Sequence, residues 1–566
     1  MSDKKSFVFP LLISALAIGL ASCKNNSAGE TGSSKAYFDY FHYEGHDSYY
    51  ESTPLPTAES LYNPLLPGWY SDPTLCTNGE GDYFLATSTF AYFPGVPLFL
   101  SRDLVNWRQV GNILSRESQL VDMQRQSVSE GIFAPALAYN KQNKTYYMIT
   151  TNVGVGNFFV KTQNPYGEWS DPIALPEVGG IDPSFFFDDN GKAYIVNNDE
   201  APDKKTEYDG HRTIMIQEFD IENDKTIGER KIIVNKGVHP EDKPIWIEGP
   251  HLYKINGKYM LMAAEGGTSE GHSEVLFTAN EPMGPYTPVA VNPILTQRHL
   301  NPDRPNPVTC SGHADLIQTN EGDWWAVFLA CRPIGSGYEN LGRETFMMPV
   351  RWTKEGTPYI TKDEEVVPMI IERQGVRPDS AAQRGNFTVD VSFDNDKLPL
   401  DWMSLRTSAE QHYSLAQKGC LQLTCSTNKL SEKGSPAYIC RRLQHHKFTC
   451  ETSMRFKPEG SEQAGMAIFK DENHYYYFAV RQSDSNNKLC VYKSENGVST
   501  ELASADVDAS VANFGLRIVS EGTSFAFFYN TDNEWKKLTD NVDAAFLSTA
   551  YAGGFTGTTI GFYAEK

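Results

Sequence analysis

The sequence predicts an all-β protein, a five-bladed β-propeller followed by a C-terminal β-sandwich of the jelly-roll or lectin-like type. Two observations predict this order. A strand–turn–strand phrase recurs five times between residues 72 and 333, and short strands without that phrase follow from about residue 385. The chain has 566 residues. One hydrophobic core organises at most about 250–300 residues, so at least two domains are expected.

Each copy of the phrase is typical of a β-hairpin. It opens with small or polar residues, runs into an apolar strand, turns on Gly or polar residues, and returns as an aromatic-rich strand. The copies start 48 to 66 residues apart, a period typical of propeller blades with several strands each. Because a propeller brings equivalent strand starts to one central mouth, the opening residues form the candidate active site. They are Asp72, Ala134, Asp182, Glu248 and His313.

Two of these residues, Asp72 and His313, have a competing structural interpretation. Asp72 precedes a proline, as many ordinary turn aspartates do, but the repeat favours a role in the site. Glu248 lies in an otherwise apolar strand. A buried carboxyl group is costly, and burial raises its pKa, which a general acid near neutral pH requires. A lone histidine such as His313 is more often structural, and only its place in the repeat makes it a candidate.

Aromatic residues and one arginine are expected near the same mouth. Phe90 lies in an aromatic loop after the first copy, and Phe133 immediately precedes Ala134, the first residue of the second copy. Such rings can stack on the apolar C–H face of a sugar, with loop packing as the alternative. A strand after the fifth copy carries Arg343 toward the mouth, and Phe555 lies in a Gly-flanked loop near the C-terminus.

The composition excludes some functions. Acidic residues outnumber basic ones 71 to 50, which gives a formal net charge of −21. A nucleic-acid binder would carry a basic surface, so this class is excluded, and a neutral ligand such as a sugar suits the charge better than an anion. The nine cysteines form no C-x-x-C pair or metal-type spacing. We expect most of them to be buried, and the sequence fixes no disulfide pairing.

The N-terminus predicts export. Lys4 and Lys5 precede a short apolar run that ends in Leu-Ala-Ser-Cys23. This ending resembles the lipobox of bacterial lipoproteins, in which Cys23 is lipidated; a plain secretory signal is the alternative. The expected location is therefore a bacterial membrane, periplasmic or at the cell surface, with contact only through a lipid anchor at Cys23. The expected segments are a signal peptide (1–23), a tether and lead-in (24–60), the propeller (61–377) and the sandwich (385–566).

Several phrases occur in one order along most of the chain. They are Leu66-Pro-Gly-Trp-Tyr-Ser-Asp72-Pro, Thr89-Phe-Ala-Tyr-Phe-Pro-Gly-Val-Pro, Asp182-Pro-Ser-Phe-Phe, Glu248-Gly-Pro-His-Leu-Tyr, Ser311-Gly-His313-Ala, Leu341-Gly-Arg343-Glu-Thr and Gly553-Gly-Phe555-Thr-Gly. Their combination resembles glycoside hydrolase family 43, specifically its two-domain β-xylosidase and α-L-arabinofuranosidase-like members.

The resemblance implies an inverting exo-glycosidase. Asp72 would be the general base that activates water, Glu248 the acid that protonates the leaving oxygen, and Asp182 the group that tunes the pKa of the acid. Inversion needs two carboxyl groups about 6.5–9.5 Å apart, with room for water between them. A further carboxylate beside the acid keeps its proton bound by like-charge repulsion.

The resemblance also implies the binding residues. Arg343 would hold a substrate hydroxyl, and Phe555 would close one wall of a single-sugar pocket containing Phe90 and Phe133. Family members use the equivalent of His313 near the propeller axis, often beside a calcium ion, so a structural calcium is expected there and no cofactor is required. Phe133 stands where family members commonly have Trp. The choice between β-D-xylose and α-L-arabinofuranose, released from xylo- or arabino-oligosaccharides of hemicellulose, therefore stays open.

Two other functions compete with this interpretation. A surface lipoprotein could bind glycans without cutting them, but binding alone would not need three carboxyl groups in the repeat. An endo-arabinanase would need an open groove, whereas the aromatic loop and the added sandwich favour a closed pocket. The oligomeric state is left open by the sequence.

Overall fold

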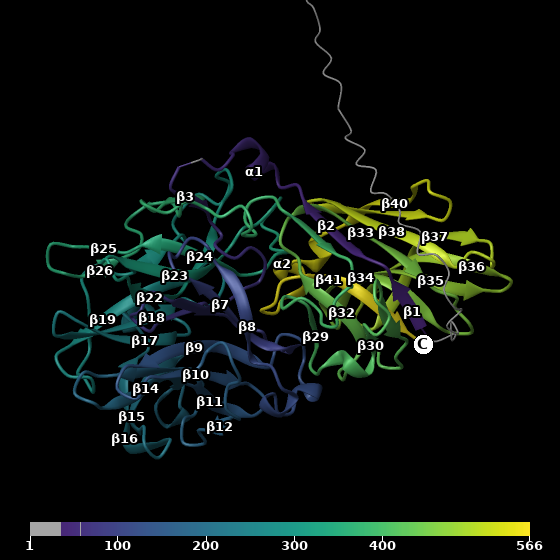
Figure 1. Ribbon diagram of the computed structural model, residues 1–566. Helices are drawn as coiled ribbons and strands as arrows, with labels where there is room; N and C mark the ends of the chain where they lie inside the picture. Colours follow the sequence, from purple (N-terminus) through teal and green to yellow (C-terminus); the bar gives the residue numbers. More distant parts are fainter. Residues whose placement is uncertain (1–34, 57) are drawn as a thin grey trace, which may run out of the picture. The chain divides into compact units, whose positions relative to one another are not determined.

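A computed structural model describes residues 35–56 and 58–566. The predicted signal peptide, Cys23 and the first part of the tether lie outside these residues. The described chain is nearly all β, with two short α-helices, α1 (Ser48–Ser52) and α2 (Thr549–Ala552). None of its helices is long and apolar enough to cross a membrane. The predicted propeller and sandwich are both present (Figure 1), so the predicted fold class is confirmed.

Five antiparallel sheets form the blades, each built from strands that follow one another in the chain, except that β6 between β5 and β7 belongs to the sandwich. Aromatic rings pack between neighbouring blades; Phe159 of blade two lies edge-on to Phe185 of blade three, with ring centroids 5.4 Å apart. Blade one contains β4 (Thr74–Thr77), β5 (Tyr83–Ala86), β7 (Gly95–Ser101) and β8 (Arg108–Leu114), and blade two contains β9 (Ile132–Asn140), β10 (Thr145–Asn152), β11 (Gly156–Thr162) and β12 (Ile173–Ala174). Blade three contains β13 (Ile181–Phe187), β14 (Ala193–Glu200), β15 (Arg212–Asp220) and β16 (Lys225–Asn235), and blade four contains β17 (Glu248–Ile255), β18 (Lys258–Glu265), β19 (Ser273–Ala279), β20 (Thr287–Pro288) and β21 (Leu295–Thr296). Blade five contains β22 (Thr309–Gln318), β23 (Trp324–Cys331) and β24 (Glu344–Pro349).

The segment before blade one closes the ring against blade five. The Asn63 side chain donates to the Met347 carbonyl and accepts from the Met347 amide, both at 3.0 Å. Leu66 then forms an isolated bridge with Thr345 of β24. Two small sheets lie outside the blades: β3 (Ser60–Tyr62) with β27 (Ile370–Glu372), and β25 (Arg351–Trp352) with β26 (Pro358–Tyr359).

The sandwich consists of a nine-stranded and an eight-stranded sheet packed around one apolar core. The nine-stranded sheet contains β1 (Lys35–Phe38), β2 (Phe41–Gly45), β28 (Thr388–Val391), β30 (Tyr413–Ser414), β31 (Leu421–Thr424), β33 (Lys447–Arg455), β38 (Asn513–Glu521), β39 (Ser524–Asn530) and β40 (Lys536–Asp543). The eight-stranded sheet contains β6 (Tyr92–Phe93), β29 (Met403–Leu405), β32 (Ala437–Arg442), β34 (Gln463–Asp471), β35 (His474–Ser483), β36 (Asn486–Glu495), β37 (Val498–Val507) and β41 (Thr559–Glu565).

Part of the predicted lead-in belongs to the sandwich. β1 pairs with β31 and β33, and β2 pairs with β28 and β33. Phe38 and Phe41 are fully buried in the sandwich core because they lie on the inward face of these strands. Figure 1 shows the two purple strands among the green and yellow ones. The segment 35–45, predicted as a connector, is therefore a structural part of the C-terminal domain.

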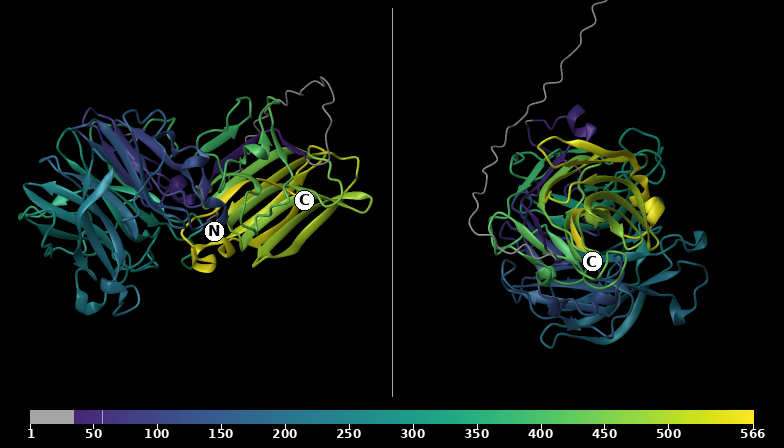
Figure 2. Two further views of the ribbon diagram at one scale, coloured as in Figure 1. Left: turned by 90° about the horizontal axis from the view of Figure 1, so that it is seen from below. Right: turned by 90° about the vertical axis from the view of Figure 1, so that its right-hand side faces the viewer.

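Blade one is also joined to the sandwich by a strand. The loop between β5 and β7 contains β6, whose Tyr92 and Phe93 pair with Leu405 and Ser404 of β29. The aromatic loop of the propeller thus becomes the edge strand of the eight-stranded sheet. Figure 2 shows the two domains side by side with chain passing between them. This pairing fixes Phe90, two residues before β6, relative to the sandwich.

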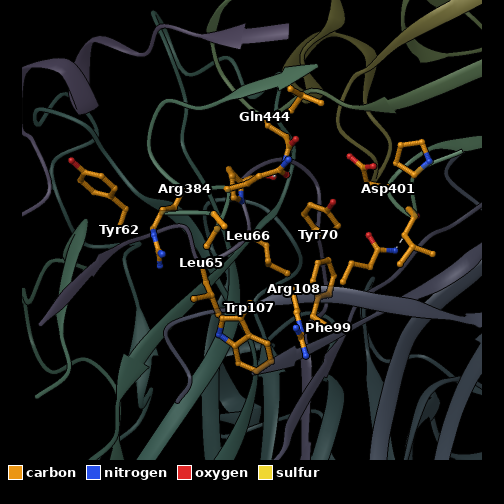
Figure 3. Close-up of a pocket in the computed structure, with 18 of the residues that line it drawn as sticks. Tyr62, Leu65, Leu66, Tyr70, Phe99, Trp107, Arg108, Arg384, Asp401 and Gln444 are labelled. Carbon is orange, nitrogen blue, oxygen red and sulfur yellow. Dashed lines mark hydrogen bonds between the residues drawn. The ribbon is translucent and has the colours of Figure 1, made fainter. Parts of the chain in front are cut away.

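A separate pocket is lined by residues of both the propeller and the sandwich (Figure 3). Tyr70, Phe99 and Trp107 line it on the propeller side, and Asp401 and Gln444 on the sandwich side. Its volume is about 470 Å³, and it shares no lining residue with the pocket described next.

Candidate active site

The first strands of the five blades share an unusual backbone conformation. One residue near the start of each has a left-handed φ, between 31° and 54°. A positive φ is uncommon outside glycine and is kept where surrounding contacts hold it, often at functional sites. In blades two to five the strand pairing shifts at this position, which is a β-bulge that turns the side chain toward the propeller mouth. The five residues are Asp72, Ala134, Asp182, Gly249 and His313.

One expectation from the repeat is wrong. In blade four the residue equivalent to Asp72 and Asp182 is Gly249, and Glu248 stands one position earlier. Glu248 pairs with Ala264 immediately before the bulge, as Ile181 pairs with Asn198 in blade three. A side chain on Gly249 would meet the His313 ring at 2.8 Å, so glycine is needed there. The carboxyl group of blade four therefore enters the site from a different position.

All eight predicted site residues nevertheless line one pocket. Its volume is about 750 Å³, within the roughly 300–1,000 Å³ typical of small-molecule sites. The pocket lies at the mouth of the propeller and is closed on one side by the sandwich loop that carries Phe555. The eight residues are Asp72, Phe90, Phe133, Asp182, Glu248, His313, Arg343 and Phe555.

Asp72 is held as a carboxylate. Ser88 donates to its Oδ2 at 2.5 Å, and Arg343 Nη1 lies 3.6 Å from Oδ1. Burial opposes ionisation, but the Arg343 charge and the Ser88 hydrogen bond outweigh it, so the pKa of Asp72 lies below its ordinary value. Ser88 also accepts from the Ala134 amide at 2.8 Å. Blade two, whose repeat residue has no polar side chain, thus helps to position the carboxylate through its backbone.

Glu248 and Asp182 are buried acids whose pKa values are both raised. Burial, followed by the charges of Asp182 and Asp72, raises the pKa of Glu248 well above its ordinary value. Burial and the Asp72 charge raise the pKa of Asp182 to about 7. Asp182 Oδ2 accepts from the Gly249 amide at 3.1 Å, which joins it to the residue after Glu248. At neutral pH the pair keeps Glu248 protonated beside an ionised Asp72.

Arg343 and three phenylalanines form the wall opposite these acids. Phe133 lies edge-on to Phe90 and Phe555, with centroids 5.5 and 5.7 Å apart, and Phe90 and Phe555 are parallel at 6.4 Å. The Arg343 guanidinium lies 5.3 Å from the Phe555 ring. The Phe555 amide donates to Ser129 at 3.0 Å, which ties the sandwich loop to the propeller. The wall offers an apolar face for a sugar ring beside a fixed cation.

His313 is buried and neutral. Burial lowers its pKa to about 4, and its Nδ1 lies 3.8 Å from Asp72 Oδ1. Calcium takes six to eight oxygen ligands. Among the described residues His313 belongs to no group of three His, Cys, Asp or Glu side chains with ligand atoms within 4.8 Å of one another. The described side chains around His313 do not provide a calcium site, so the predicted calcium gains no support.

Sequence reasoning missed the opposite rim. Trp246 lines the pocket, and its ring lies 4.6 Å from the Arg212 guanidinium. Arg212 is held in place by hydrogen bonds to Asn198 Oδ1 at 3.2 and 2.8 Å. Trp246 and Ile245 remain 36% and 46% exposed, a large fraction for apolar side chains at a pocket mouth. The signal was an exposed tryptophan two residues before the buried glutamate.

A propeller pocket with one ionised carboxylate, one protonated carboxyl group and an aromatic wall has the parts of a glycosidase. Comparison with known families agrees. "Glycosyl hydrolases family 43" matches residues 61–358, and "Beta xylosidase C-terminal Concanavalin A-like domain" matches residues 390–566. The chain belongs to glycosyl hydrolases family 43 and is a glycoside hydrolase.

Individual relatives resemble nearly the whole chain. A "Xylosidase/arabinosidase" of Butyrivibrio fibrisolvens is 36% identical over 89% of this chain and 95% of its own length. A "Non-reducing end alpha-L-arabinofuranosidase" of Bacteroides ovatus is 33% identical over 90% and 92%. Among solved structures, a GH43_12 protein from a capybara gut metagenome is 40% identical with a TM-score of 0.87, covering 94% of this chain and 99% of that one. A xylan beta-1,4-xylosidase of Bacillus halodurans is 30% identical with a TM-score of 0.79, covering 89% and 96%.

Proposed function

We propose that this hydrolase releases terminal pentose units from xylo- or arabino-oligosaccharides with inversion at the anomeric carbon. The observation that carries the proposal is the opposite perturbation of two carboxyl groups in one pocket. The pKa of Asp72 is lowered and that of Glu248 is raised. Such a pair supplies a base and an acid at the same pH.

In the proposed reaction Asp72 takes a proton from a water molecule, whose oxygen attacks the anomeric carbon. The glycosidic bond breaks on the opposite face, and Glu248 gives its proton to the leaving oxygen. Asp182 keeps that proton on Glu248 before the reaction, because two neighbouring anions repel. Arg343 holds a hydroxyl of the sugar, and the phenylalanine wall covers its apolar face. No step requires a cofactor.

We propose that both β-D-xylosides and α-L-arabinofuranosides are substrates. The names of the relatives include both activities, and Phe133, smaller than the expected Trp, widens the pocket beside the sugar. The sugar that leaves would lie against Trp246 and Ile245 at the rim. Because the Phe555 ring closes one side of the pocket, the pocket favours cleavage at chain ends over cleavage within a chain.

The direct test is kinetics on an aryl β-D-xyloside and an aryl α-L-arabinofuranoside, with NMR detection of the first anomer formed. Asp72→Asn and Glu248→Gln are expected to reduce kcat/KM on the better substrate by at least about 10³-fold. Glu241→Gln, an exposed carboxylate before blade four, is the matched control and should keep full activity. Undiminished cleavage in either variant would falsify the assigned roles. A product of retained configuration would contradict inversion, and internal cleavage of arabinan would favour an endo-acting enzyme.

We also propose that the protein is exported and anchored through a lipid on Cys23. The support is the lipobox-like ending of the N-terminal apolar run. Cys23→Ala should move the enzyme from the membrane fraction to the soluble fraction of a bacterial host. Unchanged membrane association would contradict the anchor.

A further inference from the structure

Three polar side chains gather behind Arg343 at one end of blade five. Cys310 lies near the start of β22, Cys331 ends β23, and Glu339 lies in the loop that leads to Arg343. One ligand atom from each lies within 4.8 Å of the others. The two cysteines are 4% and 1% exposed. Neither the proposed reaction nor the sugar-binding wall uses these groups.

We propose that Cys310, Cys331 and Glu339 bind a thiophilic divalent cation such as Zn²⁺, with the Thr309 hydroxyl or a water as fourth ligand. Thiolate sulfur and carboxylate oxygen are both ligand types that zinc binds. The site is distinct from the sugar pocket, because none of its residues lines that pocket.

Among Thr309, Cys310 and Glu339 the distances between the donor atoms fit a tetrahedral ion, and a ligand atom of Cys331 lies within 4.8 Å of those of Cys310 and Glu339. Bond lengths of about 2.3 Å to sulfur and 2.0–2.2 Å to oxygen give edges of roughly 3.6 Å between sulfur and oxygen and 3.4 Å between two oxygens. Cys310 Sγ lies 3.5 Å from Glu339 Oε1. Thr309 Oγ1 lies 3.5 Å from the same oxygen and 3.7 Å from Cys310 Sγ. Three of the edges are thus close to the required lengths before any ion is added.

Backbone geometry brings the two cysteines together. Thr309 pairs with Cys331, and the pairing then shifts before Gly312. Cys310 adopts a left-handed φ of 56° at this irregularity, an uncommon conformation for cysteine. The shift places the Cys310 thiol beside the Cys331 thiol, with which it interacts.

The charges around Cys310, Cys331 and Glu339 are compatible with a bound divalent cation. Two thiolates and one carboxylate around a divalent ion leave one net negative charge. The side chain of Lys470, from β34 of the sandwich, is fully buried nearby and interacts electrostatically with Glu339 and Cys331. Its ammonium group would balance that charge. Glu339 and Thr309 are half-buried, and the loop from Gly335 to Gly337 is exposed, so an ion can enter from this side.

The test uses Co²⁺ as a spectroscopic probe on the full protein, kept reduced with a phosphine and freed of metal by a chelator. We expect one Co²⁺ per chain, with the intense visible and ultraviolet absorption of tetrahedral cobalt–thiolate coordination, competed by Zn²⁺. Binding should release the thiol protons and therefore strengthen as the pH rises.

Substitutions show which side chains bind the ion. Cys331→Ser should remove the thiolate absorption of one ligand and weaken binding at least about tenfold, and Glu339→Gln should weaken binding while keeping the thiolate absorption. Cys450→Ser, a buried thiol in the sandwich, and Glu241→Gln, from the exposed trio His239, Glu241 and Asp242, are the controls and should bind normally. Retained circular dichroism and glycosidase activity verify the fold.

Four results would overturn the proposal. They are no cobalt–thiolate absorption in the parent protein, the same absorption in Cys331→Ser, loss of binding in either control, and a Cys310–Cys331 disulfide that survives the reductant. Because the readout is metal binding, a failure here leaves the assignment of Asp72 and Glu248 untouched, and the reverse also holds.

Discussion

Arg343 of the propeller contacts both the backbone and the ring of Phe555 of the sandwich. The guanidinium donates to the Phe555 carbonyl at 3.4 Å and lies 5.3 Å from the centroid of the same residue's ring. The same guanidinium lies 3.6 Å from Asp72 Oδ1. The sandwich therefore contributes to the geometry around the Asp72 carboxylate as well as to the pocket wall, so loss of Phe555 should affect substrate binding.

Phe555→Ala should lower kcat/KM by about tenfold, mainly through a higher KM. Removing the ring takes away about 1–1.5 kcal/mol of aromatic contact, and 1.4 kcal/mol corresponds to a factor of ten. Tyr551→Ala is the matched control, since Tyr551 is an exposed aromatic residue four positions earlier that does not line the pocket. Equal kinetics of Phe555→Ala and the parent protein would show that the ring does not contact the sugar.

The pH profile of kcat/KM should be bell-shaped. Below the lowered pKa of Asp72 the base is protonated and activity falls; above the raised pKa of Glu248 the acid is lost and activity falls again. Activity should therefore extend to lower pH than an ordinary aspartate allows and persist through neutral pH. An alkaline decline at the ordinary pKa of a glutamate would argue against Glu248 as the acid.

Asp182→Asn should move the alkaline side of this profile toward lower pH. The Asp182 charge is, after burial, the largest cause of the raised pKa of Glu248, so its removal lets Glu248 ionise earlier. The amide can still accept from the Gly249 amide, which preserves the contact at 3.1 Å. An alkaline side that stays in place would mean that Asp182 acts only by positioning. Asp188→Asn, a buried aspartate elsewhere in blade three, serves as the control for general disturbance of that blade.

Local patterns were sufficient to predict the blades and part of the pocket lining, but not Trp246 and Arg212. The hairpin phrase is a pattern of strand and turn residues that are close together in the sequence. Its repetition then places Asp72 and Asp182 at equivalent positions of their blades. The same reasoning failed at Glu248, because the left-handed residue of blade four is Gly249. The proline that follows the repeat residue in blades one to four marks this one-residue offset, since in blade four it follows Gly249.

Long-range pairings were not predictable from the sequence. β6 is a two-residue strand inside an aromatic loop, and it forms only because β29, about 310 residues later, offers a free edge. β1 and β2 likewise pair with strands some 350 or more residues away. Such contacts between distant segments leave no periodic signal, so the lead-in was predicted as a connector.

The buried ion pair between Arg332 and Glu344 should be important for stability. Arg332 makes two hydrogen bonds to Glu344, at 2.6 and 2.8 Å, and a third to Tyr50 at 3.1 Å. Arg332→Met should destabilise the protein by about 3–5 kcal/mol, because it leaves the buried charges of Glu344 and Asp47 without their cation. Urea denaturation measures the change.

The double variant Arg332→Met/Glu344→Gln tests the cause. It removes the Glu344 charge but keeps an acceptor for the Gly68 amide, so it should be more stable than Arg332→Met alone. Lys536→Met, which breaks an exposed ion pair with Asp532, should change stability by no more than about 1 kcal/mol. A double variant less stable than the single one would contradict this explanation.

Lys470 should support catalysis from outside the pocket by holding the Phe555 loop. Its ammonium group donates to the Thr556 carbonyl, next to Phe555, and to Thr549 Oγ1 at 3.3 Å. Lys470→Met fills a similar volume but cannot donate, so the loop loses its buried anchor and KM should rise severalfold with a smaller change in kcat. If the loss acts through the ring, Lys470→Met should add little to Phe555→Ala in a double-mutant cycle. Fully additive losses would mean that Lys470 acts independently of Phe555.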